Sequence, residues 1–335
     1  MELDLAIAGA TSLVGEAILA LLEDMDFPIG QLYLLDEGDA VGAPAGFRKR
    51  KLMIEDLETF NFARAAITLF ALDAERAAAM LPRITAADCL VVDLSGHSAG
   101  NPDVPLLVAA VNPDVLDTLP AGKVIAAADP TVVMLLRAVH PIQQNAGIEQ
   151  INLTVCQAVS NFGREGVSEL ASQTAELLNA RPVKTRVFPK QIAFNLLPEY
   201  DEGNRQGYSA KEARIQEQTC RILEMPDLPV NPMVITAPVF FGDSLAVQLV
   251  TETVAELRDV AGWWRRSLGL KPGKEKRIPT AVTDAAGGDQ VGVGRLRKNI
   301  HHEKGIDFWM VADNVRVGAA MNSIQIAQIL VKKHF

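Results

Sequence analysis

A segment near the start of the chain has the residue types and spacing of a phosphate-binding loop. Gly9–Gly15 reads GATSLVG, follows an apolar stretch and precedes a helical pattern. A strand that turns tightly into a helix points backbone N–H groups and the positive helix end at a bound pyrophosphate. Ser12 stands where the middle glycine is usual, so its side chain narrows the pocket without closing it. The predicted cofactor-binding residues of this loop are Gly9, Thr11, Ser12, Leu13, Val14 and Gly15.

Acidic residues follow the second predicted strand, roughly twenty positions beyond the loop, where dinucleotide folds carry a ribose contact. They are Asp36, Glu37 and Asp39. A carboxylate here accepts hydrogen bonds from a ribose 2′-hydroxyl and repels a 2′-phosphate. Because no arginine is close by in the sequence, NAD is favoured over NADP, with Asp36 as the contact. The alternatives are NADP, or an acidic turn with no cofactor at all.

The elements that must position this loop alternate short apolar strands with helical patterns. Such alternation implies crossover units and a parallel sheet covered on both faces. The predicted strands are Leu3–Ala8, Gln31–Leu35, Ile67–Ala71, Cys89–Leu94 and Lys123–Ala127. The predicted helices are Val14–Leu22, Asp73–Leu81 and Pro113–Leu119.

The pattern changes at about Ile148, where apolar and polar residues begin to alternate as in an antiparallel sheet with one exposed face. The amphipathic segment Ala319–Lys333 predicts a terminal helix, which we expect to return to the first domain. The predicted elements between them are strands Ile148–Cys156 and Leu245–Thr253 and helices Gly166–Leu178, Lys211–Leu223 and Asp259–Leu268.

Nine sequence blocks, in order and spacing across nearly the whole chain, together resemble the aspartate-semialdehyde dehydrogenase family. The blocks are GATSLVG (Gly9–Gly15), PDVP (Pro102–Pro105), QAVS (Gln157–Ser160), GREG (Gly163–Gly166), FPKQIAFNLL (Phe188–Leu197), PVFFGDS (Pro238–Ser244), GRLRK (Gly294–Lys298), HEKG (His302–Gly305) and DNVRVGAAMN (Asp313–Asn322).

The resemblance implies an α/β fold with two domains. The first is a Rossmann-type, doubly wound parallel sheet made from residues 1–128 plus 315–335. The second, residues 129–314, is an α/β catalytic and dimerisation domain with a mainly antiparallel sheet. The resemblance also implies a homodimer and adds Asn314 to the cofactor contacts.

The family's reaction needs groups that this sequence does not have at the matching positions. In the family a cysteine thiolate attacks the aldehyde, hydride passes to the nicotinamide, phosphate cleaves the thioester, and a histidine moves protons. Asp129 stands at the cysteine position and Asp243 at the histidine position, while Thr236 and Ala99 replace two arginines. We therefore predict no activity in the phosphate-dependent semialdehyde reaction.

Two positions keep the residue that the resemblance assigns to the site. Gln157 matches a residue near the reacting carbonyl, and Glu212 matches a contact to the substrate amine. Each also has an ordinary explanation: Gln157 as a polar strand residue, and Glu212 as part of a capping box that begins at Ser209.

No other residue completes a nucleophile–base pair. Cys156 is expected to face the core if Gln157 faces the cleft, because successive strand side chains point to opposite faces. His97 follows a strand end, and His301 and His302 belong to a charged turn.

Three functions remain open. The first is a catalytically silent relative with a binding or regulatory role. The second is a divergent NAD-linked oxidoreductase acting on an aldehyde or oxo group in amino-acid metabolism. The third uses Asp129 and Asp243 as a coupled carboxylate pair or as ligands of a hard cation. Against the third, Asp129 can simply cap the helix that begins near Pro130.

Composition limits partners and location. The net charge of −9 disfavours nucleic acid, and no apolar run reaches the ~20 residues of a membrane span. Cys89, Cys156 and Cys220 are too scattered for a disulfide framework or a zinc site, so no metal is predicted and the cysteines are expected to be buried. With no basic leader at the N-terminus, the chain is expected to be cytoplasmic.

Overall fold

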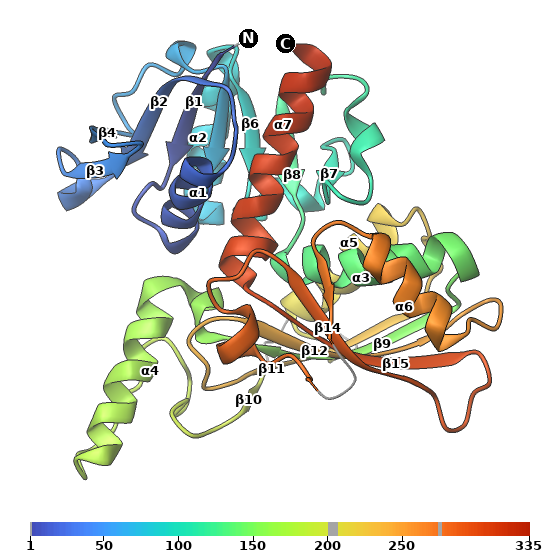
Figure 1. Cartoon of the computed structure of the whole chain (residues 1–335). Coiled ribbons are helices and arrows are strands. Elements are labelled where there is room, and N and C mark those ends of the chain that lie inside the picture. The colour runs from blue at the N-terminus through green and yellow to red at the C-terminus, as the bar shows by residue number, and fades with distance from the viewer. Residues whose placement is uncertain (1, 200–206, 274–276) are drawn as a thin grey trace. The chain divides into compact units, whose positions relative to one another are not determined.

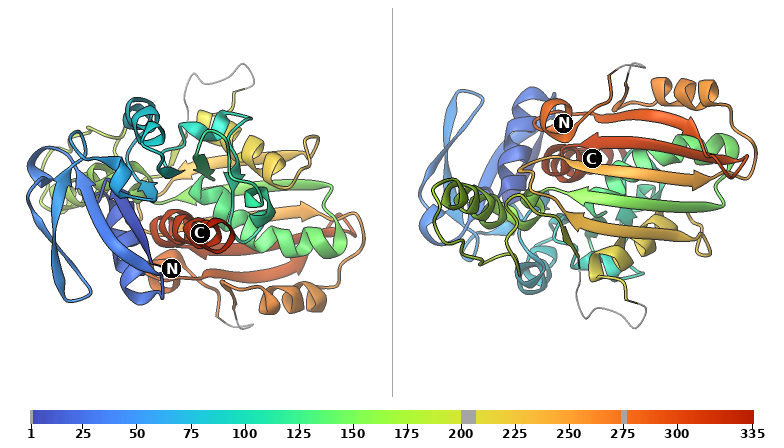
Figure 2. Two further views of the ribbon diagram at one scale, coloured as in Figure 1. Left: turned by 90° about the horizontal axis from the view of Figure 1, so that it is seen from above. Right: turned by 90° about the horizontal axis from the view of Figure 1, so that it is seen from below.

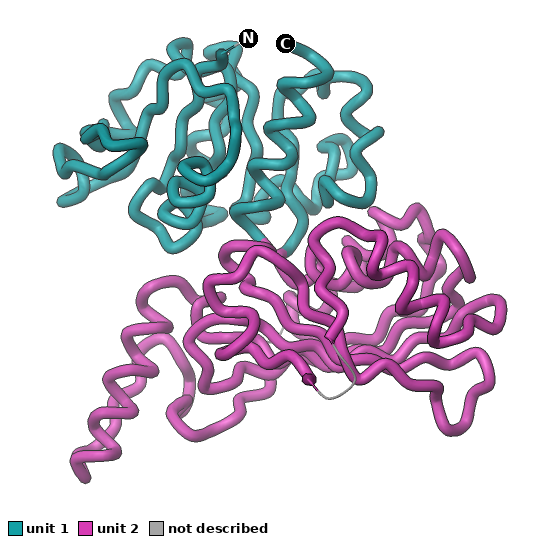
Figure 3. The backbone as a smooth tube through the Cα atoms, in the orientation of Figure 1, with its two compact units in different colours: residues 1–129, 319–335 teal, residues 130–318 magenta. Residues whose placement is uncertain are grey.

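The computed structural model describes residues 2–199, 207–273 and 277–335 (Figure 1). The chain forms two compact units, which Figure 3 colours separately. Unit 1 is Met1–Asp129 with Ala319–Phe335, and unit 2 is Pro130–Gly318. The sequence predicts that the chain passes from the first domain to the second after residue 128 and returns after residue 314. In the structure these boundaries follow Asp129 and Gly318.

Unit 1 is built on an eight-stranded sheet in the order β3-β4-β2-β1-β5-β6-β8-β7. Neighbouring strands are parallel, except that β3 is antiparallel to β4. The parallel sheet was predicted, whereas the half-polar pair β3 and β4 was not. The strands are β1 (Leu3–Ala8), β2 (Ile29–Asp36), β3 (Pro44–Phe47), β4 (Arg50–Asp56), β5 (Ile67–Phe70), β6 (Leu90–Asp93), β7 (Leu106–Leu107) and β8 (Val124–Ala127).

The helices of unit 1 make this sheet doubly wound, as predicted. Helix α1 (Leu13–Asp24) joins β1 to β2, and α2 (Ala74–Ala86) joins β5 to β6. The connection from β1 to β2 and the connection from β5 to β6 run in opposite directions across the sheet. Right-handed crossovers therefore place α1 and α2 on opposite faces. The C-terminal helix α7 (Asn322–His334) also belongs to unit 1 and packs against β6.

One predicted helix of unit 1 is wrong. The segment 113–119 forms only a short 3₁₀ turn, Pro113–Leu116. Pro120 explains the early end, because a proline disfavours the helical conformation of the residue before it. The other short 3₁₀ turns of this unit are Gly38–Ala40, Phe62–Arg64 and Ser98–Gly100.

Unit 2 contains a seven-stranded mixed sheet in the order β10-β11-β9-β12-β15-β14-β13. Only the pairs β11–β9 and β14–β13 are parallel, so the sheet is mainly antiparallel, as predicted. The strands are β9 (Gln150–Gln157), β10 (Leu197–Pro198), β11 (Val230–Thr236), β12 (Asp243–Val250), β13 (Leu270–Pro272), β14 (Val291–Lys298) and β15 (Gly305–Ala312).

Helices cover one face of this sheet and leave the other open. Helix α5 packs against β11, and α3 and α6 pack against β14. The right panel of Figure 2 shows the opposite face with no helix across its strands. The described helices of unit 2 are α3 (Pro130–Ala146), the 3₁₀ helix η5 (Val159–Phe162), α4 (Gly163–Leu178), α5 (Ala210–Ile222), α6 (Leu257–Arg266) and the π-helix η6 (Ala281–Ala285). A second π-helix, η7 (Asn314–Met321), begins in unit 2 and ends in unit 1. None of the described helices has the length and apolarity that crossing a bilayer requires.

Candidate functional site

The glycine loop of unit 1 lies where β1, β2 and β5 end. Gly9 has a φ of +83°, and a Cβ there would lie 2.8 Å from the carbonyl oxygen of Ala71. A Cβ on Gly15 would lie 2.1 Å from the carbonyl oxygen of Gly9. The tight turn and the close approach of helix to strand therefore both require glycine at these positions.

Ser12, in place of the middle glycine, is the N-cap of α1. Its Oγ accepts a hydrogen bond from the N–H of Gly15 at 2.9 Å. Leu13 and Val14 are the first two residues of α1, and N–H groups at that position have no partner within a helix. The loop can therefore offer these two donors to an anion.

Asp36 holds the glycine loop in place. One oxygen of its carboxylate, Oδ2, accepts hydrogen bonds from the N–H and the hydroxyl of Thr11, both at 2.7 Å. Its other oxygen accepts from the N–H of Glu37 at 2.9 Å, and the residue is only 8% exposed. The residue expected to contact the ribose is therefore already bonded to protein donors, and Glu37 is the more accessible acid.

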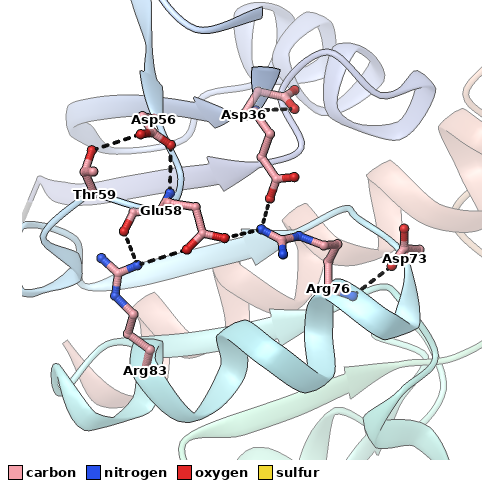
Figure 4. A network of polar contacts seen from close by, with 8 residues as sticks. Asp36, Asp56, Glu58, Thr59, Asp73, Arg76 and Arg83 are labelled. Atoms are coloured by element: carbon pink, nitrogen blue, oxygen red, sulfur yellow. Dashed lines mark hydrogen bonds and ion pairs between the residues drawn. The ribbon is translucent and has the colours of Figure 1, made fainter. Parts of the chain in front are cut away.

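An arginine that the sequence did not place near these acids lies beside Glu37. Arg76 of α2 forms an ion pair with Glu37. It forms a second one, at 2.5 Å, with Glu58 (Figure 4). Sequence separation concealed this contact, since Arg76 and Glu37 are 39 residues apart. No arginine lies near these acids in the sequence, but Arg76 contacts Glu37 in the fold, so the absence that favoured NAD does not hold in the structure.

Three predicted site residues of unit 2 lie on one face of the sheet at neighbouring strand ends. Thr236 closes β11 and is paired in register with Gln157 at the end of β9. Asp243 opens β12, next to the end of β9. Strand alternation turns all three side chains toward the buried side, and together with Asn161, Glu199 and Lys211 they form what we call the Gln157 cluster.

Gln157 is fully buried and bonded through both ends of its amide. Its Nε2 donates to Glu199 Oε1 at 2.6 Å and to Thr236 Oγ1 at 2.9 Å. Its Oε1 accepts from the ammonium of Lys211 at 2.6 Å. Gln157 therefore organises the cluster, and Lys211, which the sequence did not single out, brings a positive charge to it.

Asp243 holds the turn that follows β9. Its Oδ1 accepts from the N–H of Ala158 at 2.7 Å and from Nδ2 of Asn161 at 2.9 Å. The same Asn161 accepts from Lys211 at 3.2 Å, and Asp243 is 0% exposed. This carboxylate is thus tied to the backbone at the position that the family resemblance gives to a proton carrier.

Glu212 has the structural role that its capping box predicts. The Ser209 hydroxyl accepts from the N–H of Glu212, and the Glu212 carboxylate accepts from the N–H of Ser209 at 2.8 Å. Its second oxygen accepts from the N–H of Val234 at 2.8 Å, which fastens α5 to β11. The capping box is confirmed.

None of the three cysteines has the lowered pKa of a nucleophilic thiol. Burial raises the pKa of Cys89 to about 11 and also raises that of Cys220. Burial, and then the nearby charge of Asp243, raise the pKa of Cys156. Cys156 is half-buried on the open face of the sheet, so the expectation that it faces the core is wrong.

The remaining predicted residues are divided between the two units. Asp129 is in unit 1 and directly precedes α3, whereas Asp243 is in unit 2. The pairing of the two carboxylates stays a prediction. Asn314 also belongs to unit 2, where its Oδ1 accepts from the N–H of Gly242 and the hydroxyl of Ser160. Ala99 is buried, and His97 is exposed. The described residues contain no group of three or more His, Cys, Asp or Glu able to hold a metal ion.

Two family models match the chain. Residues 4–119 match the semialdehyde dehydrogenase NAD binding domain, and residues 139–317 match the semialdehyde dehydrogenase dimerisation domain. These stretches lie in unit 1 and unit 2 respectively.

Curated relatives match over essentially their whole length. Aspartate-semialdehyde dehydrogenase 2 of Vibrio cholerae is 37% identical over 100% of this chain and 99% of its own. A protein of Pseudomonas aeruginosa named USG-1 protein homolog is 39% identical over 99% of this chain and 98% of its own. A crystal structure of the Vibrio cholerae aspartate semialdehyde dehydrogenase II complexed with ASA superposes with a TM-score of 0.98, at 37% identity and full coverage of both chains.

Proposed function

The chain belongs to the aspartate-semialdehyde dehydrogenase family, and we propose that it keeps the family's nicotinamide dinucleotide site but does not catalyse the phosphate-dependent semialdehyde reaction. Its role is then to bind or regulate rather than to oxidise this substrate.

The bonding of Asp243 carries this proposal. A group that takes a proton from the reacting thiol and returns it needs an accessible lone pair and freedom to reorient. Asp243 is fully buried, and one of its oxygens already accepts from a backbone N–H and an amide. Its bonds favour a fixed structural carboxylate over a mobile base.

The thiols support the same proposal. The covalent step of the family needs a thiolate, which is the reactive form of cysteine. By the family resemblance Asp129 stands at the cysteine position, and the pKa values of all three cysteines in the chain are raised. A neutral thiol elsewhere does not replace the missing nucleophile.

The dinucleotide part of the proposal rests on the glycine loop. Leu13 and Val14 would donate their N–H groups to the pyrophosphate at the start of α1. The bound cofactor would supply a hydride acceptor or donor. The acids that follow β2 support NAD as the preferred form.

The test is an assay of NAD- and NADP-dependent oxidation of aspartate semialdehyde in phosphate buffer, followed by absorbance of the reduced cofactor. We expect no turnover by the wild type or by Asp129→Cys, because Thr236 and Asp243 also differ from the family pattern. The Vibrio cholerae relative serves as the positive control. Turnover by the wild type above the enzyme-free blank would contradict the proposal.

We also propose a homodimer through the open face of the unit 2 sheet. The match to a dimerisation domain supports a second copy as the occupant. Side chains in register across four strands form the centre of this face: Thr154, Met233, Ala246 and Trp309. Met233 is 58% exposed in the single chain, and an apolar side chain of this size gains free energy when a partner covers it.

A further inference from the structure

The backbone of Arg76 is fixed beside the glycine loop. Arg76 lies in the first turn of α2, where its N–H donates to the N-capping carboxylate of Asp73 at 2.8 Å. The connection that leads into α2 contains Ala71 and Leu72, which are the residues that Gly9 approaches most closely. The arginine thus extends from an element that adjoins the loop within unit 1.

Two carboxylates hold the guanidinium of Arg76 through a single nitrogen. Its Nη2 donates to Oε1 of Glu37 and to Oε1 of Glu58. Hydrogen bonds to Glu58 and then to Glu37 raise the pKa of Arg76, so it remains a cation. Its buried Nε has no hydrogen-bond partner among the described residues. The fork of donors is therefore only partly used.

Glu58 is itself held in position. Its N–H donates to Asp56 Oδ1 at 2.9 Å, and its carboxylate lies 4.0 Å from Nη1 of Arg83 (Figure 4). Arg83 also donates to the carbonyl of Phe60 at 2.7 Å, which anchors its side chain. Glu58 can therefore restrain Arg76 without reorganising.

The location gives this network a consequence for a bound cofactor. In dinucleotide-binding folds an acid after the second strand receives the ribose 2′-hydroxyl, whereas an arginine nearby accommodates a 2′-phosphate. Here Glu37 follows Asp36 at the end of β2. Both kinds of residue are therefore present, and Glu37 forms an ion pair with Arg76. The three negative charges of Asp36, Glu37 and Glu58 outweigh the two positive charges of Arg76 and Arg83, so a phosphate would be repelled.

We propose that Glu37 and Glu58 restrain Arg76 and thereby set a preference for NAD, and that Arg76 is a latent binding group for the 2′-phosphate of NADP. The inference rests on the proposed dinucleotide site and names the residues that determine its specificity. Without the two carboxylates, the guanidinium fork would be available for bidentate contact with the phosphate.

The test measures dissociation constants for NADH and NADPH by titration calorimetry. The proteins are the wild type, Glu37→Gln, Glu58→Gln, the double variant, and the double variant with Arg76→Gln added. We expect the wild type to bind NADH more tightly. The double variant should shift the NADPH/NADH affinity ratio toward NADPH by roughly tenfold or more, about 1.4 kcal/mol. Adding Arg76→Gln should abolish that shift.

Glu55→Gln is the matched control. Glu55 lies in β4 of the same unit and pairs with Arg64 at 2.7 Å, outside the contacts of Arg76. Glu55→Gln removes one negative charge, as Glu37→Gln does. A general electrostatic effect would therefore shift the NADPH/NADH affinity ratio equally in the two variants. Equal shifts in these two variants would overturn the inference.

The outcomes separate this inference from the proposed function. The unfolding midpoint of the double variant shows whether it is folded. If NADH binds and the folded double variant keeps the wild-type NADPH/NADH affinity ratio, the restraint on Arg76 is refuted and the dinucleotide site stands. If the wild type binds neither nucleotide, the cofactor part of the proposed function is refuted, and the specificity role with it.

Discussion

At the scale of single residues, three carboxylates at the candidate sites serve the backbone. Asp36 accepts from the N–H of Thr11, Asp243 from that of Ala158, and Glu212 from that of Val234. Charge-assisted bonds of this kind are strong, and breaking one leaves a buried donor without an acceptor. Acids at family site positions are therefore poor indicators of catalysis unless their bonds are examined.

Asp243→Ala should reduce the free energy of unfolding by about 1–3 kcal/mol, because the N–H of Ala158 would lose its acceptor. Asp243→Asn keeps an oxygen at the same place and should cost less. Chemical denaturation of both variants measures the difference. Equal losses in the two variants would mean that the hydrogen bond to Ala158 is not the cause.

Cys156 should resist alkylation near neutral pH. Burial and the charge of Asp243 raise its thiol pKa, so at any given pH less of it is thiolate than in a free cysteine. The rate with iodoacetamide, followed by mass spectrometry of the Cys156 peptide, should therefore rise only at higher pH than for an unstructured peptide. In Asp243→Asn the pH dependence should move toward lower pH. A rate at pH 7 equal to that of the free peptide would contradict this expectation.

At the scale of elements, most of the strands and helices that periodicity predicted are present, with bounds correct to within five residues, whereas β11, β14 and β15 were not predicted. Strand β1 was predicted at Leu3–Ala8 and is found there, because an apolar run before a glycine turn has few alternatives. Strands β3 and β4 were missed because Pro44–Asp56 is half polar and only pairs at the sheet edge.

Patterns in the sequence predicted contacts of the site only where the residues are close together, whereas the family resemblance supplied the distant set Gln157, Thr236 and Asp243. The cap of Ser209 and Glu212 was visible because its members are three residues apart. The contacts of Arg76 with Glu37 and of Lys211 with Gln157 span 39 and 54 residues. Such contacts depend on strand order and side-chain direction, which periodicity does not give.

The attachment of α5 to β11 gives a prediction at this scale. Glu212→Ala removes half of the capping box and the acceptor of the Val234 N–H, and should lower the free energy of unfolding by about 1–3 kcal/mol. Glu212→Gln keeps an acceptor oxygen and should lose less. Urea denaturation distinguishes the two. If Glu212→Ala is as stable as the wild type but no longer binds a ligand that the wild type binds, Glu212 would have a substrate-binding role in place of the structural one.

At the scale of the whole molecule, the open face of the unit 2 sheet is the proposed contact between two copies. Met233→Glu would place a charge in the middle of the proposed contact between two copies, opposite Thr154 in the register. We expect this variant to be monomeric by light scattering after size exclusion, where the wild type is a dimer.

Leu268→Glu is the control for that experiment. Leu268 is 94% exposed and follows α6, which lies over the opposite face of the sheet. The same charge introduced there should leave the dimer intact. A wild type that elutes as a monomer, or a Met233→Glu protein that stays dimeric, would reject this face as the contact.

The chain builds unit 1 from both of its ends. The side-chain oxygen of Asn322 in α7 accepts from the N–H of Ala109 at 2.9 Å, across 213 residues. During synthesis unit 1 therefore cannot be completed until α7 leaves the ribosome, by which time unit 2 has already emerged and is able to fold. Loss of about a dozen residues from α7 would leave a nascent protein with unit 2 folded and unit 1 incomplete. Such a chain is a substrate for chaperones and proteases.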